Sequence, residues 1–105
     1  MSKGDVFEND LMKLIFQGTA IANVADNASS SPITNLFVSL HTGDPGEAGV
    51  QTTSEANYGA YARVAVARST VGWTIATNTV TPAATISFPA STSGTNTITH
   101  FVVGT

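Results

Sequence analysis

His41 and His100 are the two histidines of the chain and the first side chains to test for catalysis or metal binding. Each lies in a segment of alternating apolar and polar residues, and Ser39 shares a face with His41 because side chains alternate along a strand. A serine beside a histidine can form a nucleophile and its base, yet no nucleophile-elbow or oxyanion-loop motif accompanies this pair. A metal site needs several oriented ligands. The pattern therefore favours hydrogen-bonded strand histidines, with no catalytic residue and no metal.

Two acidic residues, Asp44 and Glu47, lie in a loop rich in glycine and proline at residues 42–49. Their carboxylates can bind calcium, but their spacing fits no EF-hand loop. They can also be imagined as a glycosidase pair, yet no second acidic segment flanks them. The loop glycines do not form a phosphate-binding fingerprint, because no helix pattern follows. The composition favours a solvated turn, and the sequence indicates no cofactor.

Three aromatic residues, Tyr58, Tyr61 and Trp73, fall close together in the sequence. Aromatic faces stack on the apolar faces of sugars, so these side chains are candidate contacts for a host-surface glycan. The alternative is that a lone tryptophan in a small β protein anchors the core or an interface. The second interpretation is the stronger one, and it needs no ligand.

The chain has 105 residues and only four basic ones, Lys3, Lys13, Arg63 and Arg68. They form no basic stripe that can release counterions from a phosphate backbone, which argues against nucleic acid as a partner. The two arginines can instead form bidentate pairs with carboxylates across a subunit boundary, or lie on a solvated face.

Charged residues make up 10% of the chain, against about 25% in an average soluble domain. Serine and threonine supply the polarity, and threonine favours extended backbone. No apolar run approaches the roughly 20 residues that span a bilayer, so we expect no membrane insertion. The chain contains no cysteine, and its stability must therefore come from packing or assembly without disulfides.

The N-terminal segment has the pattern of an amphipathic helix at residues 6–17. Its apolar stripe consists of Phe7, Leu11, Leu14 and Ile15. Asp5 and Glu8 have the spacing of a capping box, and Gly18 is a suitable stop. A helix of this length is marginal alone in water, so its stripe must pack on a sheet or on a neighbouring subunit.

Short β-branched and aromatic runs, separated by Asn, Pro, Ser and Gly, predict about six strands. They lie at residues 36–41, 61–68, 72–76, 79–81, 83–88 and 97–103. The sequence therefore predicts a mostly β fold, an antiparallel β-sandwich or partly open barrel with one N-terminal amphipathic helix. The length fits a single domain at 1–105, in which residues 19–35 connect the helix to a β domain at 36–103.

Several segments together resemble a family of small virion proteins of tailed bacteriophages, commonly called tail-fibre proteins. The segments are Leu40-His41-Thr42-Gly43-Asp44-Pro45-Gly46, Tyr61-Ala62-Arg63-Val64, Gly72-Trp73-Thr74, Ile86-Ser87-Phe88-Pro89 and Thr99-His100-Phe101. The resemblance implies a structural protein made in the host cytoplasm and located in the virion, in the tail or on the capsid surface. It supplies no catalytic residue, so we expect no enzyme. The alternatives are a capsid decoration protein and a glycan-binding module for receptor recognition.

Two surfaces are the expected assembly contacts with copies of the chain and with other virion proteins. One is the helix stripe around Phe7, Leu11 and Leu14, and the other is the last strand with Ile98, Phe101 and Val103. Relatives continue past the Thr-His-Phe segment, whereas this sequence stops at Gly104-Thr105. An unpaired edge invites pairing by another chain. We therefore expect that a neighbouring subunit covers this edge or that the chain is a fragment.

Overall fold

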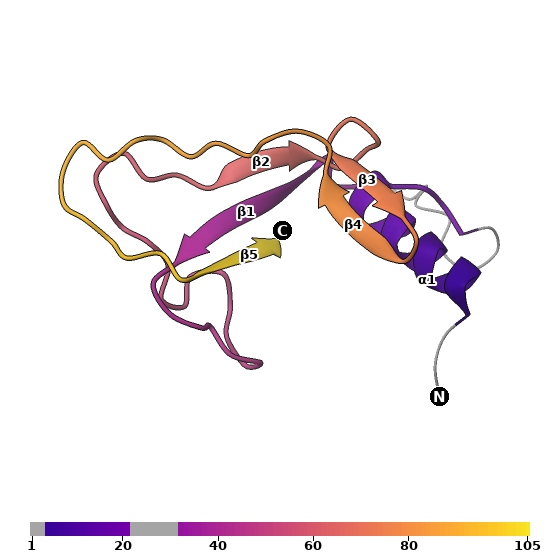
Figure 1. The fold of residues 1–105 in the computed structure, drawn as a ribbon, viewed down its shortest axis with the longest axis horizontal. Coiled ribbons are helices and arrows are strands. Elements are labelled where there is room, and N and C mark those ends of the chain that lie inside the picture. The colour runs from indigo at the N-terminus through magenta and orange to yellow at the C-terminus, as the bar shows by residue number, and fades with distance from the viewer. Residues whose placement is uncertain (1–3, 22–31) are drawn as a thin grey trace. The chain divides into compact units, whose positions relative to one another are not determined.

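The computed structural model describes residues 4–21 and 32–105. Over these residues the chain forms one short helical segment and five strands, so the mostly β prediction is confirmed. The elements are α1 (Asp5–Met12), η1 (Lys13–Gln17), β1 (Asn35–His41), β2 (Val64–Ala67), β3 (Trp73–Ala76), β4 (Thr79–Pro82) and β5 (His100–Gly104). Strands β2, β1 and β5 form one sheet in that order, and β3 and β4 form another. No closed barrel is present in the described part (Figure 1).

The chain divides into two compact units, each made of two segments. The first unit consists of Met1–Leu36 and Val66–Thr85, and the second consists of Phe37–Ala65 and Ile86–Thr105. The single domain at 1–105 stays a prediction. Most of the expected connection at 19–35 lies outside the described residues, and β1 already begins at Asn35.

In the first unit, the helix packs against the β3–β4 hairpin (Figure 1). Thr77 and Asn78 form the hairpin turn with φ of 50° and 60°, the left-handed pair typical of a type I′ turn. The predicted capping box is wrong, because Gly4 is the N-cap and no side chain caps the helix. The Asp5 carboxylate instead accepts a hydrogen bond of 3.0 Å from the Asn78 side-chain amide, which ties the helix to the turn.

The end of the helical segment agrees with the glycine stop expected from the sequence. Residues Lys13–Gln17 are π-helical, and Gly18 ends them with a left-handed φ of 68°. The Arg68 guanidinium donates to the carbonyls of Leu14 and Ile15 at 2.5 and 2.7 Å. Carbonyl groups at a helix C-terminus lack partners within the helix, so this arginine satisfies them.

Packing in the first unit centres on Trp73, which is 3% exposed. Its ring meets that of Phe16 edge-on at 4.8 Å, and its carbonyl accepts a bond from Gln17. Along the expected apolar stripe, Leu11 and Leu14 are half-buried, whereas Phe7 is 45% exposed. The hairpin thus covers only part of the stripe.

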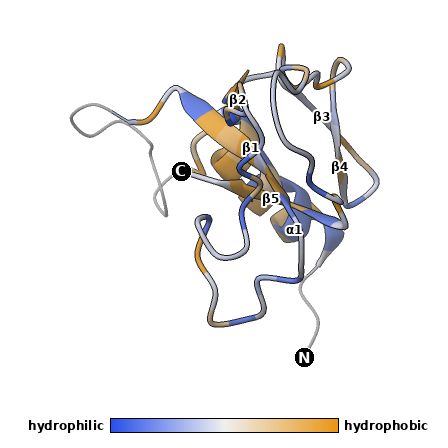
Figure 2. Ribbon diagram, turned by 90° about the vertical axis from the view of Figure 1, so that its left-hand side faces the viewer, coloured by the Kyte–Doolittle hydropathy of each residue, from blue (hydrophilic) through white to orange (hydrophobic). Residues whose placement is uncertain are grey.

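In the second unit, β5 pairs antiparallel with β1, with His41 opposite His100 and Ser39 opposite Val102. Figure 2 shows that β1 is hydrophobic over most of its length, and Val38 within it is 4% exposed. Over the described residues β5 has β1 as its one neighbour, so it forms an edge of the sheet.

Three strand predictions need correction. The segment 83–88 is not a strand: it pairs with no strand among the described residues, and Phe88 stacks on Tyr61. Strand β2 occupies only Val64–Ala67 of the predicted 61–68, and β5 starts three residues later than predicted, at His100.

Candidate functional site

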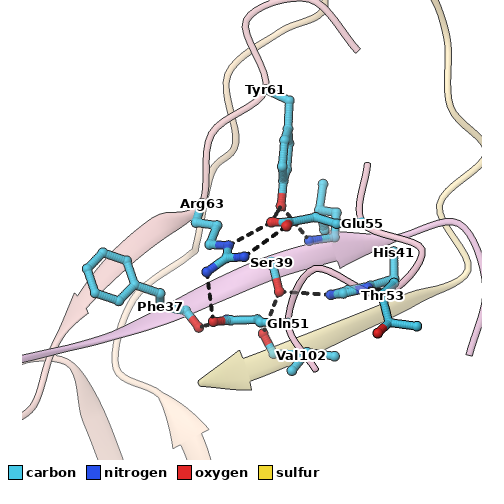
Figure 3. Close-up of polar contacts among 10 residues, drawn as sticks. Phe37, Ser39, His41, Gln51, Thr53, Glu55, Tyr61, Arg63 and Val102 are labelled. Carbon is cyan, nitrogen blue, oxygen red and sulfur yellow. Dashed lines mark hydrogen bonds and ion pairs between the residues drawn. The ribbon is translucent and has the colours of Figure 1, made fainter. Parts of the chain in front are cut away.

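The central strand β1 carries a buried hydrogen-bonded pair, Ser39 and His41, both 0% exposed (Figure 3). Ser39 Oγ lies 2.9 Å from His41 Nε2, and His41 Nδ1 lies 2.7 Å from the Thr53 carbonyl oxygen. A carbonyl only accepts, so Nδ1 carries the proton, and in the neutral ring Nε2 accepts the Ser39 hydroxyl proton. The pair joins β1 to the segment around Thr53.

This pair resembles a nucleophile and its base in distance alone. Both side chains are fully buried, so a substrate has no access to Ser39 Oγ. The partner that orients His41 is a backbone carbonyl, whereas a catalytic triad places a carboxylate there to stabilise the imidazolium. A buried polar group costs free energy unless it is paired. The contacts of Ser39 and His41 therefore act as structural hydrogen bonds of the interior.

A second polar cluster joins Glu55, Arg63 and Tyr61 (Figure 3). Arg63 forms a bidentate pair with the carboxylate of Glu55: its Nε donates to Oε1 at 2.7 Å, and its Nη2 donates to Oε2 at 2.9 Å. Tyr61 donates its hydroxyl to the same Oε1 at 2.8 Å and accepts the Leu40 N–H at 3.1 Å. Paired bonds of this kind are among the strong polar contacts of proteins.

The electrostatics of this cluster follow from these contacts. The hydrogen bond from Arg63 holds the pKa of Glu55 below its ordinary value, so the carboxylate is ionised at neutral pH. The same bond raises the pKa of Arg63. Burial raises the pKa of Tyr61, whose hydroxyl therefore keeps the proton that it donates. Both carboxylate oxygens of Glu55 thus accept hydrogen bonds from groups of the chain itself.

Gln51 extends this cluster to the sheet. Its side-chain oxygen accepts from Arg63 Nη1 at 3.1 Å, and its side-chain nitrogen donates to the Phe37 carbonyl at 2.8 Å. The Gln51 amide lies close to Gly104: a Cβ atom added to that glycine would come within 2.9 Å of it.

Sequence reasoning missed the Gln51–Glu55–Arg63 set. The available signal was the spacing of Tyr61 and Arg63 by two residues, which places both on one side of an extended segment. Arg63 pairs with a carboxylate as considered above, but within the chain. Arg68 instead binds the helix carbonyls.

The three candidate glycan contacts are not equivalent. Trp73 is covered in the first unit and presents no exposed stacking face. Tyr58 and Tyr61 meet edge-on at 5.4 Å in the second unit, and each hydroxyl donates to an oxygen of the chain itself, on Pro89 and Glu55 respectively. These contacts give both tyrosines packing roles.

An open groove of about 710 Å³ lies in the second unit between β5 and the loop at residues 44–52. Asp44 on its rim accepts the Gly46 N–H at 2.8 Å, which is the bond of a solvated turn. Within residues 4–21 and 32–105 no group of three or more His, Cys, Asp or Glu side chains can hold a metal ion. In the same residues no helix is long and apolar enough to cross a membrane.

The expected assembly residues near the end of the chain lie in or next to β5. Phe101 is 69% exposed and Ile98 is 38% exposed, whereas Val103 is half-buried. Phe101 and Val103 both line the groove. The most exposed apolar ring of this unit thus lies on its edge strand.

The fold and its polar clusters define a small β-rich protein whose buried polar groups hold loops onto a sheet. The chain matches the family model described as podophage GP4 fiber I protein gp80 over residues 2–105, and it belongs to this family of phage fibre proteins. The match confirms the resemblance drawn from the sequence and gives the chain a structural role in a phage tail fibre, within the virion. No curated protein and no solved structure matches it.

Proposed function

We propose that this chain is a non-catalytic subunit of the tail fibre, made in the host cytoplasm, that works by binding copies of itself and other virion proteins. The observation that carries the proposal is the family match along nearly the whole chain. The polar clusters support it, because Ser39 and His41 are buried and Glu55 is paired with Arg63 within the chain.

Labelling of purified particles tests the location. A gold-labelled antibody against the chain should bind along the tail fibre in electron micrographs. Label on the capsid surface would overturn the fibre assignment in favour of a capsid decoration protein. Particles that lack the chain serve as the control for specific labelling.

A host-surface glycan is a further candidate partner, resting on Tyr58 and Tyr61. Both rings pack within the chain and both hydroxyls are used there, so the described contacts favour protein assembly over sugar binding. A glycan array tests this directly: binding that is lost in Tyr58→Ala while the variant stays folded would support the glycan.

A further inference from the structure

We propose that β5 pairs with β5 of a second copy of this chain, antiparallel and centred on Val102. The inference rests on the self-assembly part of the proposed function and names the surface that performs it. It follows from the direction of the backbone groups on β5, the side chains of that strand and the space beside it.

The hydrogen bonds of β1 determine which backbone groups of β5 point outward. The Leu40 N–H and C=O bond to Tyr61 Oη and to the Ala56 N–H, away from β5. The His41 carbonyl, one residue on, accepts the Thr99 N–H at 3.0 Å and so points toward the C-terminal segment. Backbone groups of successive strand residues point to opposite sides.

The register then transfers this alternation to β5. Ser39 lies opposite Val102, and His41 lies opposite His100, so these residues of β5 direct their backbone groups toward β1. Phe101 and Val103 consequently direct theirs to the open side of the strand. That side is an edge of the sheet over the described residues.

The side chains of β5 lack the features that protect exposed edges. Natural edge strands carry lysine, proline or inward-pointing charges that discourage pairing. The strand His-Phe-Val-Val-Gly has no Lys, Arg, Asp, Glu or Pro. Phe101 is 69% exposed, and β5 lines one wall of the open groove of about 710 Å³.

A second copy of β5 fits this edge by its own symmetry. With the two-fold axis at Val102, Phe101 of one copy lies opposite Val103 of the other, and both pairs can exchange N–H and C=O bonds. Each pair places an aromatic ring beside a β-branched side chain, a favourable cross-strand contact. His100 faces Gly104, and no like charges meet. This self-complementary pattern of bonds and side chains selects a second copy as the occupant.

Cysteine cross-linking tests the register, because the chain has no cysteine of its own. In the proposed pairing the two Val102 residues face each other about 4.5 Å apart at Cα, within the range of a disulfide. Val102→Cys under mild oxidation should shift to twice the monomer mass on a non-reducing gel. Phe101→Cys is the matched control, since its two copies lie out of register by two residues, beyond disulfide reach of about 7 Å.

The control also excludes random collision. Phe101 is far more exposed than the half-buried Val102, so collision favours dimers of Phe101→Cys, whereas the proposed register favours Val102→Cys. Equal cross-linking of the two variants, or more of Phe101→Cys, overturns the inference. So does a Val102→Cys chain that cross-links in purified particles only to a different virion protein.

A proline pair tests the backbone directions without a disulfide. Val103→Pro removes an outward N–H from each copy, so we expect dimerisation about tenfold weaker or more in analytical ultracentrifugation, with thermal unfolding of the monomer unchanged. Val102→Pro removes an N–H directed at β1 and should lower the unfolding temperature. Loss of monomer stability in Val103→Pro but not in Val102→Pro overturns the assigned directions.

The two proposals can fail separately. If antibody labels the fibre but Val102→Cys stays monomeric, the β5 pairing is wrong and the fibre role stands. If Val102→Cys cross-links in the predicted register but antibody labels the capsid, the pairing stands and the fibre assignment falls.

Discussion

Strands β1 and β5 lie side by side in one sheet, yet they meet their surroundings in opposite ways. Two polar side chains of β1, Ser39 and His41, are fully buried and hydrogen-bonded. In β5, the apolar ring of Phe101 is 69% exposed, and one side of the strand has no neighbouring strand among the described residues. The polar pair that suggests chemistry on β1 thus lies in the interior, whereas β5 carries the exposed apolar ring on which the proposed pairing rests.

The two histidines show this contrast within one ladder pair. His41 and His100 lie opposite each other in the register, yet His41 is 0% exposed and His100 is exposed. Residue type alone does not distinguish them. Their partners distinguish them: His41 bonds to a carbonyl of the 51–55 segment, whereas His100 bonds to the hydroxyl of the neighbouring Thr99.

The largest expected effect is the difference between the two histidine variants in the free energy of unfolding. We expect His41→Ala to lower the free energy of unfolding by about 3 kcal/mol, because it leaves a cavity and removes a hydrogen-bond partner from the buried Ser39 hydroxyl and from the Thr53 carbonyl. His100→Ala should change it by less than about 0.5 kcal/mol. Urea unfolding of both variants measures the two values. Similar losses for both would contradict the contrast between the strands.

Acid should weaken the Glu55–Arg63 pair. The pKa of Glu55 is lowered in the folded protein, mainly by the Arg63 hydrogen bond, so the pair contributes its stabilisation above the ordinary value of 4.5 and loses it as the pH falls below that value. We expect Glu55→Gln to lower the free energy of unfolding at pH 7 by about 1–2 kcal/mol.

Unfolding of wild type and Glu55→Gln between pH 7 and pH 3 measures this dependence. The difference between the two proteins should shrink below pH 4.5. Glu47→Gln, at an exposed position of the 44–52 loop, is the matched control and should keep the wild-type pH profile. A constant difference across the pH range would show that the charge of Glu55 contributes nothing.

The smallest effect on stability is expected at the exposed ring of β5. Phe101→Ser should change the free energy of unfolding of the monomer by less than about 0.5 kcal/mol, because most of the ring already contacts water. The same substitution should weaken self-association, since the ring faces Val103 of the other copy in the proposed pair. Sedimentation equilibrium of the variant measures both the monomer and the dimer. A large loss of monomer stability would mean that the Phe101 ring is packed within the monomer, which would contradict its exposure on β5.

The elements of the fold were largely predictable, and their ends were less so. The stripe from Phe7 to Ile15 located the helix, and Gly18 ended it, because both depend on local backbone geometry. The capping box failed at Asp5 because its carboxylate found a partner in the distant hairpin turn. The strand expected at 83–88 failed because β-branched composition does not ensure a neighbouring strand.

The candidate site was predictable only in its residue types. Sequence reasoning singled out Ser39, His41, Tyr61 and Arg63, but it had no means to join Arg63 to Glu55 and Gln51. Likewise, the rings of Phe16 and Trp73 are in contact although the two residues belong to segments far apart in the sequence. Such partners depend on how elements pack, and alternation along one segment carries no information about them.

The amino-acid sequence by itself determined the β-rich class, the N-terminal helix, strand β1 and the resemblance to phage fibre proteins. These properties follow from side-chain period and composition, which act over a few neighbouring residues. The tertiary structure decided which polar groups are buried together and which backbone groups of β5 remain on an open edge. These properties depend on hydrogen-bond partners far apart in sequence, because the paired and the open side of a strand differ only once its neighbouring strands are in place.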